Sequence, residues 1–115
     1  MRCFAEVSVI VHATEDLDLV FSSLKSFFGD LPYIIQPLEG HYGNPLYLIT
    51  AFIDDCEDVL KKLCAALPEV ARLEPAPGRE YYVRLDKQKF VGGVLALSAS
   101  DDVVRIKVKA HGLCG

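Results

Sequence analysis

The first dozen residues alternate between apolar and polar side chains. Every second position from Cys3 to Val11 is apolar, whereas the positions between them include Glu6 and Ser8. Side chains of a strand point alternately to its two faces, so a strand with one buried face shows this pattern. We therefore predict a strand over residues 2–12.

A helical pattern follows in the stretch LDLVFSSLKSFF, residues 17–28. Its apolar residues recur every three or four positions, which places them on one face of a helix. Thr14 is expected to cap the start of this helix, and Gly29 with Asp30 to end it before Pro32. The pattern predicts an amphipathic helix with a buried face.

The stretch DDCEDVLKKLCAALPEVARL predicts a second helix. We expect Asp54 or Asp55 to cap it and Pro68 to end or kink it. Its apolar residues share one face, which we expect to be buried. These residues are Cys56, Val59, Leu60, Leu63, Cys64 and Leu67.

The remaining apolar segments are short and predict strands. Two of them, residues 33–38 and 46–53, flank the loop EGHYGNP, and three others follow the proline-rich stretch EPAPGR. The three are Glu80 to Leu85, Val94 to Leu97 and Val103 to Lys109, and the segment DKQKFVGG between the first two predicts a capped turn or short helix. This order predicts an α+β fold: a single domain over residues 1–115, with a mostly antiparallel sheet and two main helices packed on one face.

Charge is distributed unevenly along the 115 residues, although the formal net charge is only −4. Residues 1–78 carry a net charge of −7, whereas residues 79–115 carry +3. A cationic surface built from the C-terminal third is therefore expected. No apolar run approaches the roughly 20 residues of a membrane helix, and the N-terminus lacks the pattern of a signal peptide. We expect a soluble, cytoplasmic protein.

The four cysteines, at positions 3, 56, 64 and 114, include no CxxC pair. This spacing argues against zinc, and we expect no metal or cofactor. Cys56 and Cys64 would lie ~12 Å apart on the predicted helix, too far to bridge each other, so we interpret both as small core residues. Cys3 and Cys114 could meet if the terminal strands pair, which would matter in a protein from a hyperthermophile.

The last predicted strand has valine and isoleucine on one face and cations on the other. The cations are Arg105, Lys107 and Lys109. They would project at intervals of ~6.6 Å, which suits the phosphates of an extended single strand of nucleic acid. The alternative is an edge strand whose charges prevent aggregation, and on this feature alone we favour that alternative.

Cations and aromatic residues interleave in YYVRLDKQK, residues 81–89. Recognition of single-stranded RNA uses cations for phosphates and rings for unstacked bases, which makes Arg84, Lys87, Gln88 and Lys89 candidate RNA contacts. In the alternative interpretation, the aspartate of this stretch caps a short helical turn and one tyrosine is buried. Both interpretations can hold together, because a capped turn would present the polar residues that follow it.

The loop EGHYGNP, residues 39–45, is longer than a tight hairpin needs. Its glycines, asparagine and proline are typical of a turn, and its two aromatic residues could simply cover the end of the sheet. Flexible glycines on both sides of those aromatics cost conformational entropy that a connector could avoid. We favour binding, with His41, Tyr42 and Asn44 as RNA contacts that lie near Lys87.

Motifs of common enzyme classes are absent from the sequence. It contains no nucleophile elbow, no phosphate-binding glycine loop and no HExxH, and its three histidines are widely spaced. The acidic residues of DDCED fall at a helix start, where they are ordinary. We therefore expect a protein that is not an enzyme.

Four stretches, VHATED, EGHYGNP, RLDKQ and DDVVRIKVK, occur in an order and spacing that resembles an archaeal family of small proteins described as RNA-binding and as predicted exosome subunits. The similarity runs from about Val9 to Lys109, and HYGNP and LDKQ are its specific elements. It implies a fold like that of the large-subunit ribosomal protein that binds 5S ribosomal RNA, with a non-catalytic role. The residues that match its motifs are His41, Tyr42, Gly43, Asn44, Pro45, Asp86, Lys87 and Gln88.

Two hypotheses follow from these patterns. The leading one is an RNA-binding module whose partners are RNA and, through the resemblance, exosome-type subunits. The alternative is a protein interaction module, either a homodimer or a docking subunit of an RNA-processing complex, that uses an apolar helix face or a sheet edge without binding RNA.

Overall fold

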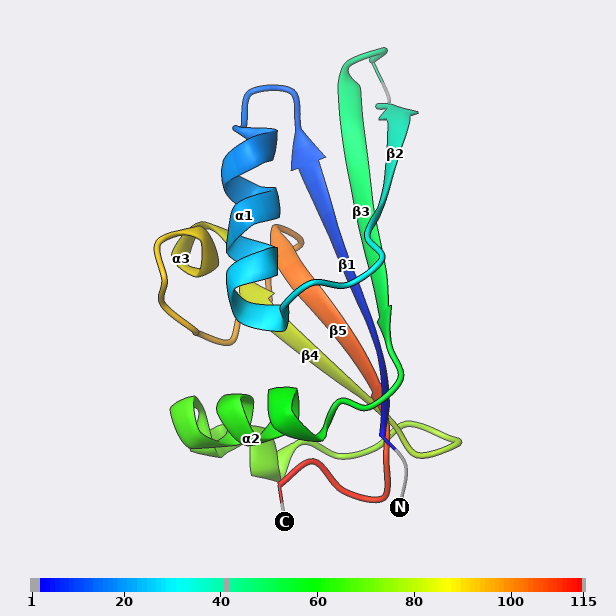
Figure 1. The fold of residues 1–115 in the computed structure, drawn as a ribbon, viewed down its shortest axis with the longest axis vertical. Coiled ribbons are helices and arrows are strands. Elements are labelled where there is room, and N and C mark those ends of the chain that lie inside the picture. The colour runs from blue at the N-terminus through cyan, green and yellow to red at the C-terminus, as the bar shows by residue number, and fades with distance from the viewer. Residues whose placement is uncertain (1–2, 41, 115) are drawn as a thin grey trace.

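A five-stranded antiparallel sheet forms the centre of the computed structural model, which describes residues 3–40 and 42–114 (Figure 1). Its strands lie in the order β2-β3-β1-β5-β4. They are β1 (Phe4–His12), β2 (Ile34–Glu39), β3 (Pro45–Ile53), β4 (Glu80–Asp86) and β5 (Val103–Lys109). Every neighbouring pair is antiparallel, so the predicted α+β fold is confirmed.

The helices gather on one side of this sheet, and the β2–β3 hairpin extends beyond them (Figure 1). They are α1 (Leu17–Phe28), α2 (Glu57–Ala66), the 3-10 helix η1 (Pro68–Arg72) and α3 (Lys87–Val91). The two predicted main helices are confirmed, and α3 is the short helix expected after Asp86. In the part of the chain that the structure describes, no helix combines the length and apolar character needed to cross a membrane.

Alternation along the strands places their apolar residues in one core. In β1 the odd-numbered residues from Ala5 to Val11 are buried, and the register pairs Val7 with Ile106 of β5. Leu24 of α1 and Leu63 of α2, both fully buried, belong to the same continuous cluster. The helices therefore cover one face of the sheet and leave the other face to solvent.

The two main helices begin slightly differently from the prediction. Asp16, not Thr14, caps α1, because its side chain accepts a hydrogen bond of 3.2 Å from a backbone N–H of the first turn. Cys56 stands at the start of α2 without a side-chain cap, and Asp55 accepts from the backbone N–H of Glu57 at 3.2 Å. Several acidic residues compete at each helix start, and the backbone geometry decides which oxygen reaches a free N–H.

The strand predicted over Val94 to Leu97 is not a strand of the sheet. This segment forms an isolated bridge between Leu97 and Leu85, and the carbonyl of Ala96 accepts a backbone hydrogen bond of 2.8 Å from Asp86. A short apolar run can pack beside a sheet as irregular chain, and periodicity alone does not separate that outcome from a strand.

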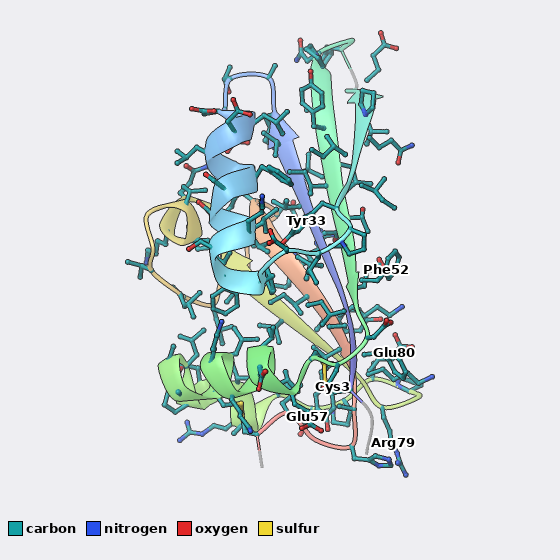
Figure 2. The ribbon with its side chains drawn as sticks, in the orientation of Figure 1. Cys3, Tyr33, Phe52, Glu57, Arg79 and Glu80 are labelled. Atoms are coloured by element: carbon teal, nitrogen blue, oxygen red, sulfur yellow. A yellow bond between two sulfur atoms is a disulfide. The ribbon has the colours of Figure 1, made fainter. Side chains whose placement is uncertain are left out.

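Two disulfides, Cys3–Cys56 and Cys64–Cys114, join both ends of the chain to α2 and its N-terminus. The interpretation of Cys56 and Cys64 as unpaired core residues is therefore wrong, as is the pairing considered for Cys3 with Cys114. Figure 2 shows Cys3 beside the start of α2, which brings it to Cys56. The sequence could not show these pairs, because they depend on where α2 packs against the two ends of the chain.

Candidate functional site

One face of the sheet, here called the open face, carries the strand residues that alternate with the buried ones. Four cations lie on it in two neighbouring strands: Arg84 on β4, and Arg105, Lys107 and Lys109 on β5. Three of them, Arg84, Arg105 and Lys107, are contacts predicted from the sequence. The structure brings these three together on one surface, because β4 and β5 pair directly.

Aromatic rings lie beside these cations. Lys107 pairs with Tyr82 of β4 and with Glu6 of β1, and Glu6 pairs with Phe52 of β3, so one row of residues crosses four strands. Phe4 lies in the next row. The three aromatic residues are 43% to 55% exposed, and Figure 2 shows Phe52 pointing away from the helices. The open face thus combines positive charge with exposed ring surface.

Two adjoining hollows run along this face. One, of about 460 Å³, is lined in part by Tyr82, Arg84 and Lys107. The other, of about 350 Å³, lies toward the C-terminal end of β1. Ser8 and Arg105 line both hollows, so the two adjoin each other over β1, β4 and β5.

Two of the four cations have acidic partners. Lys107 Nζ lies 3.0 Å from Glu80 Oε2, and the hydrogen bond and negative charge of Glu80 raise the pKa of Lys107. Arg84 Nη2 lies 3.6 Å from Asp101 Oδ1, and the Nε of Arg84 has no hydrogen-bond partner among the described residues. Both ion pairs are partly exposed and therefore weak, so a phosphate could exchange for either carboxylate.

Arg105 and Lys109 form no ion pair with the residues that the structure describes. Both side chains are exposed on β5. They are the cations best placed to contact a phosphate, because no local carboxylate has to be displaced.

Lys87, in contrast, lies inside the protein. It is 1% exposed, and its Nζ lies 2.8 Å from the carbonyl oxygen of Ile10 and 2.6 Å from both Glu15 Oε1 and Asp102 Oδ1. The contact with Asp102 is an ion pair without good hydrogen-bond alignment. The direct contact between Lys87 and RNA stays a prediction that this burial disfavours, because a ligand would have to break the ion pairs of a buried ammonium to reach it.

Gln88 and Lys89 also lie apart from the open face. Gln88 Nε2 donates to Glu15 Oε2 at 2.9 Å and to Asp102 Oδ2 at 3.2 Å, so its amide holds the carboxylates that bind Lys87. Lys89 is exposed on α3, on the side of the sheet that the helices cover. Any RNA contact of Lys89 would belong to a surface separate from β5.

The carboxylates around Lys87 have lowered pKa values. Burial raises the pKa of Glu15, but hydrogen bonds from Lys87, the His12 backbone and Gln88, with the charge of Lys87, outweigh burial and hold the pKa below its ordinary 4.5. Burial likewise opposes the contacts of Asp102 with Lys87 and Gln88, and its pKa is lowered as well. Both carboxylates are therefore ionised at neutral pH.

Three possible metal ligands, His12, Glu15 and Asp102, have atoms within 4.8 Å of one another. The ammonium of Lys87 contacts both carboxylates at 2.6 Å and supplies the positive charge between them. We therefore assign no metal to this cluster.

Three of the four family-like stretches meet at the Lys87 cluster. Glu15 comes from VHATED, Lys87 and Gln88 from RLDKQ, and Asp102 from DDVVRIKVK. These residues tie the start of α1 and the β4–α3 junction to the turn before β5. Sequence analysis missed this role, because Glu15 and Lys87 are 72 residues apart and only the fold brings them together.

The loop EGHYGNP forms the tip of the β2–β3 hairpin. The N–H of Gly40 donates to the carbonyl of Asn44 at 2.7 Å, and the φ of Gly43 is 79°, a value that favours glycine. Tyr42 is 86% exposed and Asn44 is exposed, whereas the predicted contact His41 lies outside the described residues. The end of β1 near the Lys87 cluster pairs with the start of β3 beside this tip, because His12 is the partner of Leu46. The expectation that the loop residues lie near Lys87 stays a prediction.

Phe4, Phe52 and Lys109 are open-face residues that the predicted contact list omitted. Each stands at a position that alternates with buried residues of its own strand. For Phe4 and Phe52 the signal was therefore a large apolar side chain at a position that alternates with the buried residues of its strand.

The fold and the open face together define an α+β protein whose exposed sheet face carries cations and aromatic side chains. A family model described as RNA binding matches residues 5–110, and the chain belongs to this RNA-binding family. RNA-binding protein PAB1135 from Pyrococcus abyssi is 31% identical over an alignment 123 residues long, gaps included. The alignment covers 90% of this chain and 80% of that protein.

Solved structures of archaeal proteins share the fold. Mth689 from Methanothermobacter thermautotrophicus, described as a DUF54 protein, superposes with a TM-score of 0.84 at 21% identity, covering 97% of this chain and 88% of that chain. Protein SSO0741 from Sulfolobus solfataricus gives a TM-score of 0.80 at 25% identity, covering 94% of this chain and 88% of that chain. The architecture is therefore common to proteins whose sequences have diverged widely.

Proposed function

We propose that this protein is a non-catalytic RNA-binding module whose main contact surface is the open face of the sheet. The observation that carries the proposal is the cluster of Arg84, Arg105, Lys107 and Lys109 on two paired strands. Phosphate contacts supply most of the affinity of nucleic-acid binding, and they require clustered cations of this kind. Membership of the RNA-binding family supports RNA as the ligand.

Charge elsewhere on the protein favours this face over others. The net charge is −4, and residues 1–78 are strongly acidic. A polyanion would be repelled by most of that surface and attracted to the C-terminal strands. The affinity should therefore be modest and strongly dependent on salt.

The hairpin tip is proposed as a secondary contact. Tyr42 and Asn44, with His41, could meet RNA that extends past the end of the sheet, and Lys89 could contribute from α3. We place Lys87 and Gln88 outside the interface, since both are engaged with Glu15 and Asp102.

The particular RNA and the assembly in which it is bound are further proposals. The sequence resemblance supports association with exosome-type subunits and a likeness to the ribosomal protein that binds 5S ribosomal RNA. A pull-down of purified exosome-type subunits, with and without nuclease, tests the association. Capture that survives nuclease indicates protein contact, whereas capture lost with nuclease indicates an RNA bridge.

A specific observation keeps the protein interaction module as a second candidate. All six residues of β2 are exposed, including Ile34, Ile35 and Leu38. Exposed apolar side chains of this kind are often covered by a partner. Sedimentation of the RNA-free protein tests this candidate: a tight oligomer that does not bind RNA would support it and contradict RNA binding.

Fluorescence anisotropy with labelled RNA tests the leading proposal. The variant Arg105→Ala with Lys109→Ala removes the two cations without local ion pairs and should weaken binding about tenfold or more at low salt. The matched control is Lys61→Ala with Arg72→Ala, which removes two exposed cations from α2 and η1. Equal affinity of the two double variants, or no binding by the unmodified protein at low salt, would contradict the proposal.

A further inference from the structure

Exposed apolar side chains concentrate on the open face. Of the large hydrophobic side chains that are exposed in the described structure, more than half point to this face. They are Phe4, Ile10, Ile34, Leu38, Phe52 and Tyr82. Apolar surface of this extent on a helix-free sheet marks a contact surface rather than a random scatter.

The three rings and the cations have a defined arrangement. Arg105, Lys107 and Lys109 form a line along β5, and their successive side chains are ~6.6 Å apart by strand geometry. Tyr82 flanks this line on β4, and Phe4 flanks it on β1. A ring therefore stands on each side of the line of positive charge.

Resting on the proposed function, we infer that the open face binds single-stranded RNA, with Phe4, Tyr82 and Phe52 as stacking surfaces for unpaired bases. Sequence-tolerant binding of single strands combines a cationic groove with aromatic rings, and the open face has both. The phosphates follow β5, and bases turn to either side onto the rings.

Negative charge on the open face supports a path of the RNA phosphates along β5. Glu6 lies on β1 between Lys107 and Phe52 in the same row. Its carboxylate repels a phosphate there but can accept a hydrogen bond from a base. The phosphates are therefore directed away from β1 and toward β5, whereas bases can lie beside Glu6 on the β1 side and on Tyr82 on the β4 side.

Spacing on the sheet suits separated nucleotides. With strands ~4.8 Å apart, the Phe4 and Tyr82 side chains start ~12 Å apart and those of Phe4 and Phe52 ~8 Å apart. These separations leave room for one or two nucleotides between stacked bases. A duplex hides the faces of its bases within its own stack, so it could use the cations but not the rings.

Anisotropy titrations with a labelled oligouridylate of about 12 nucleotides test the inference, with a blunt RNA duplex of the same length as the comparison probe. We expect the single strand to bind more tightly than the duplex. Tyr82→Ala should weaken single-strand binding about tenfold and leave duplex binding unchanged, whereas Tyr82→Phe should retain the affinity. Phe4→Ala and Phe52→Ala should act in the same direction.

Leu19→Ala provides the matched control, because Leu19 is an exposed apolar residue on α1, away from the open face. Thermal unfolding of each variant separates a loss of affinity from a loss of fold. If Tyr82→Ala binds the single strand normally while Arg105→Ala with Lys109→Ala does not, the stacking inference fails and the proposed function stands. If the unmodified protein binds the duplex more tightly than the single strand, the stacking inference likewise fails and the proposed function stands.

Failure of both probes to bind would instead overturn the proposed function. A second copy of this chain is the competing occupant of the open face. Sedimentation that shows a dimer broken by Tyr82→Ala, together with unchanged RNA affinity, would overturn the inference in favour of that occupant.

Discussion

The Nζ atom of Lys87 lies 2.6 Å from Oε1 of Glu15, a residue 72 positions earlier in the chain. This ion pair joins the junction of β4 and α3 to the turn that precedes α1. It gives LDKQ and VHATED, two stretches of the family resemblance, a structural role that does not require contact with RNA. Residues of a conspicuous motif can stabilise the structure that presents a binding surface elsewhere.

Replacing Lys87 should destabilise the protein more than it affects RNA binding. Lys87→Met leaves two carboxylates near a buried apolar side chain, and we expect the free energy of unfolding to fall by about 2–3 kcal/mol. This value is at or below the low end for buried pairs, since Asp102 is partly exposed. Urea unfolding measures the change, and Lys89→Ala is the neighbouring control, with an expected change under about 0.5 kcal/mol. A stable Lys87→Met variant with weakened RNA binding would contradict this assignment.

Stability should decline in acid through the same cluster. The pKa values of Glu15 and Asp102 are lowered in the folded protein from their ordinary values of 4.5 and 3.8. Protons therefore bind more readily to the unfolded chain. The stabilisation is complete above those ordinary values, declines as the pH falls below them, and is lost as the pH falls through the lowered pKa values of the folded protein. Unfolding measured from about pH 7 to pH 3 should show this loss, and Glu15→Gln should flatten the profile. An unchanged profile in Glu15→Gln would exclude the cluster as its source.

Reduction of the two disulfides should lower stability substantially. They span sequence separations of 53 and 50 residues. In the chain-entropy account, closing a loop of this size lowers the conformational entropy of the unfolded chain and stabilises the fold by about 4 kcal/mol for each bond. Thermal unfolding with and without a reductant measures the effect, and peptide mapping of the alkylated, unreduced protein identifies the pairs. Free thiols in protein purified without a reductant would contradict both bonds.

The two disulfides should also differ in reactivity. Cys3 and Cys56 are buried, whereas Cys64 and Cys114 are partly exposed. A small reductant should therefore open Cys64–Cys114 first under native conditions, because reduction requires access to a sulfur. Timed quenching with an alkylating reagent, followed by mass spectrometry, gives the order. Simultaneous loss of both bonds would indicate that reduction follows global unfolding.

Salt should weaken RNA binding in proportion to the phosphates contacted. For single strands, the slope of log K against log salt is about −0.7 for each neutralised phosphate. If Arg105 and Lys109 each contact one phosphate, removing both should make the slope shallower by about 1.4. Titrations at several salt concentrations measure this difference, and Lys61→Ala with Arg72→Ala should keep the original slope. A tenfold loss of affinity without a change in slope would indicate an indirect effect.

Local patterns predicted the elements of this protein because they depend on short-range chemistry. The alternation in β1 and the spacing of apolar residues in α1 identified a strand and a helix near their observed bounds. Side chains of a strand alternate between its two faces, so the sequence also predicted that Arg105 and Lys107 lie on the face opposite the buried residues of β5. The sequence by itself determined the α+β class, the cationic face of β5 and membership of an RNA-binding family.

Only the tertiary structure decided which of these residues act together. Strand order placed Tyr82 beside Lys107, and packing of α2 brought Cys3 to Cys56. Packing of α3 beside the turns that precede α1 and β5 enclosed Lys87 between carboxylates from distant parts of the chain. Contacts of this kind depend on how whole elements pack, and the spacing of residues along the chain carries little information about that packing.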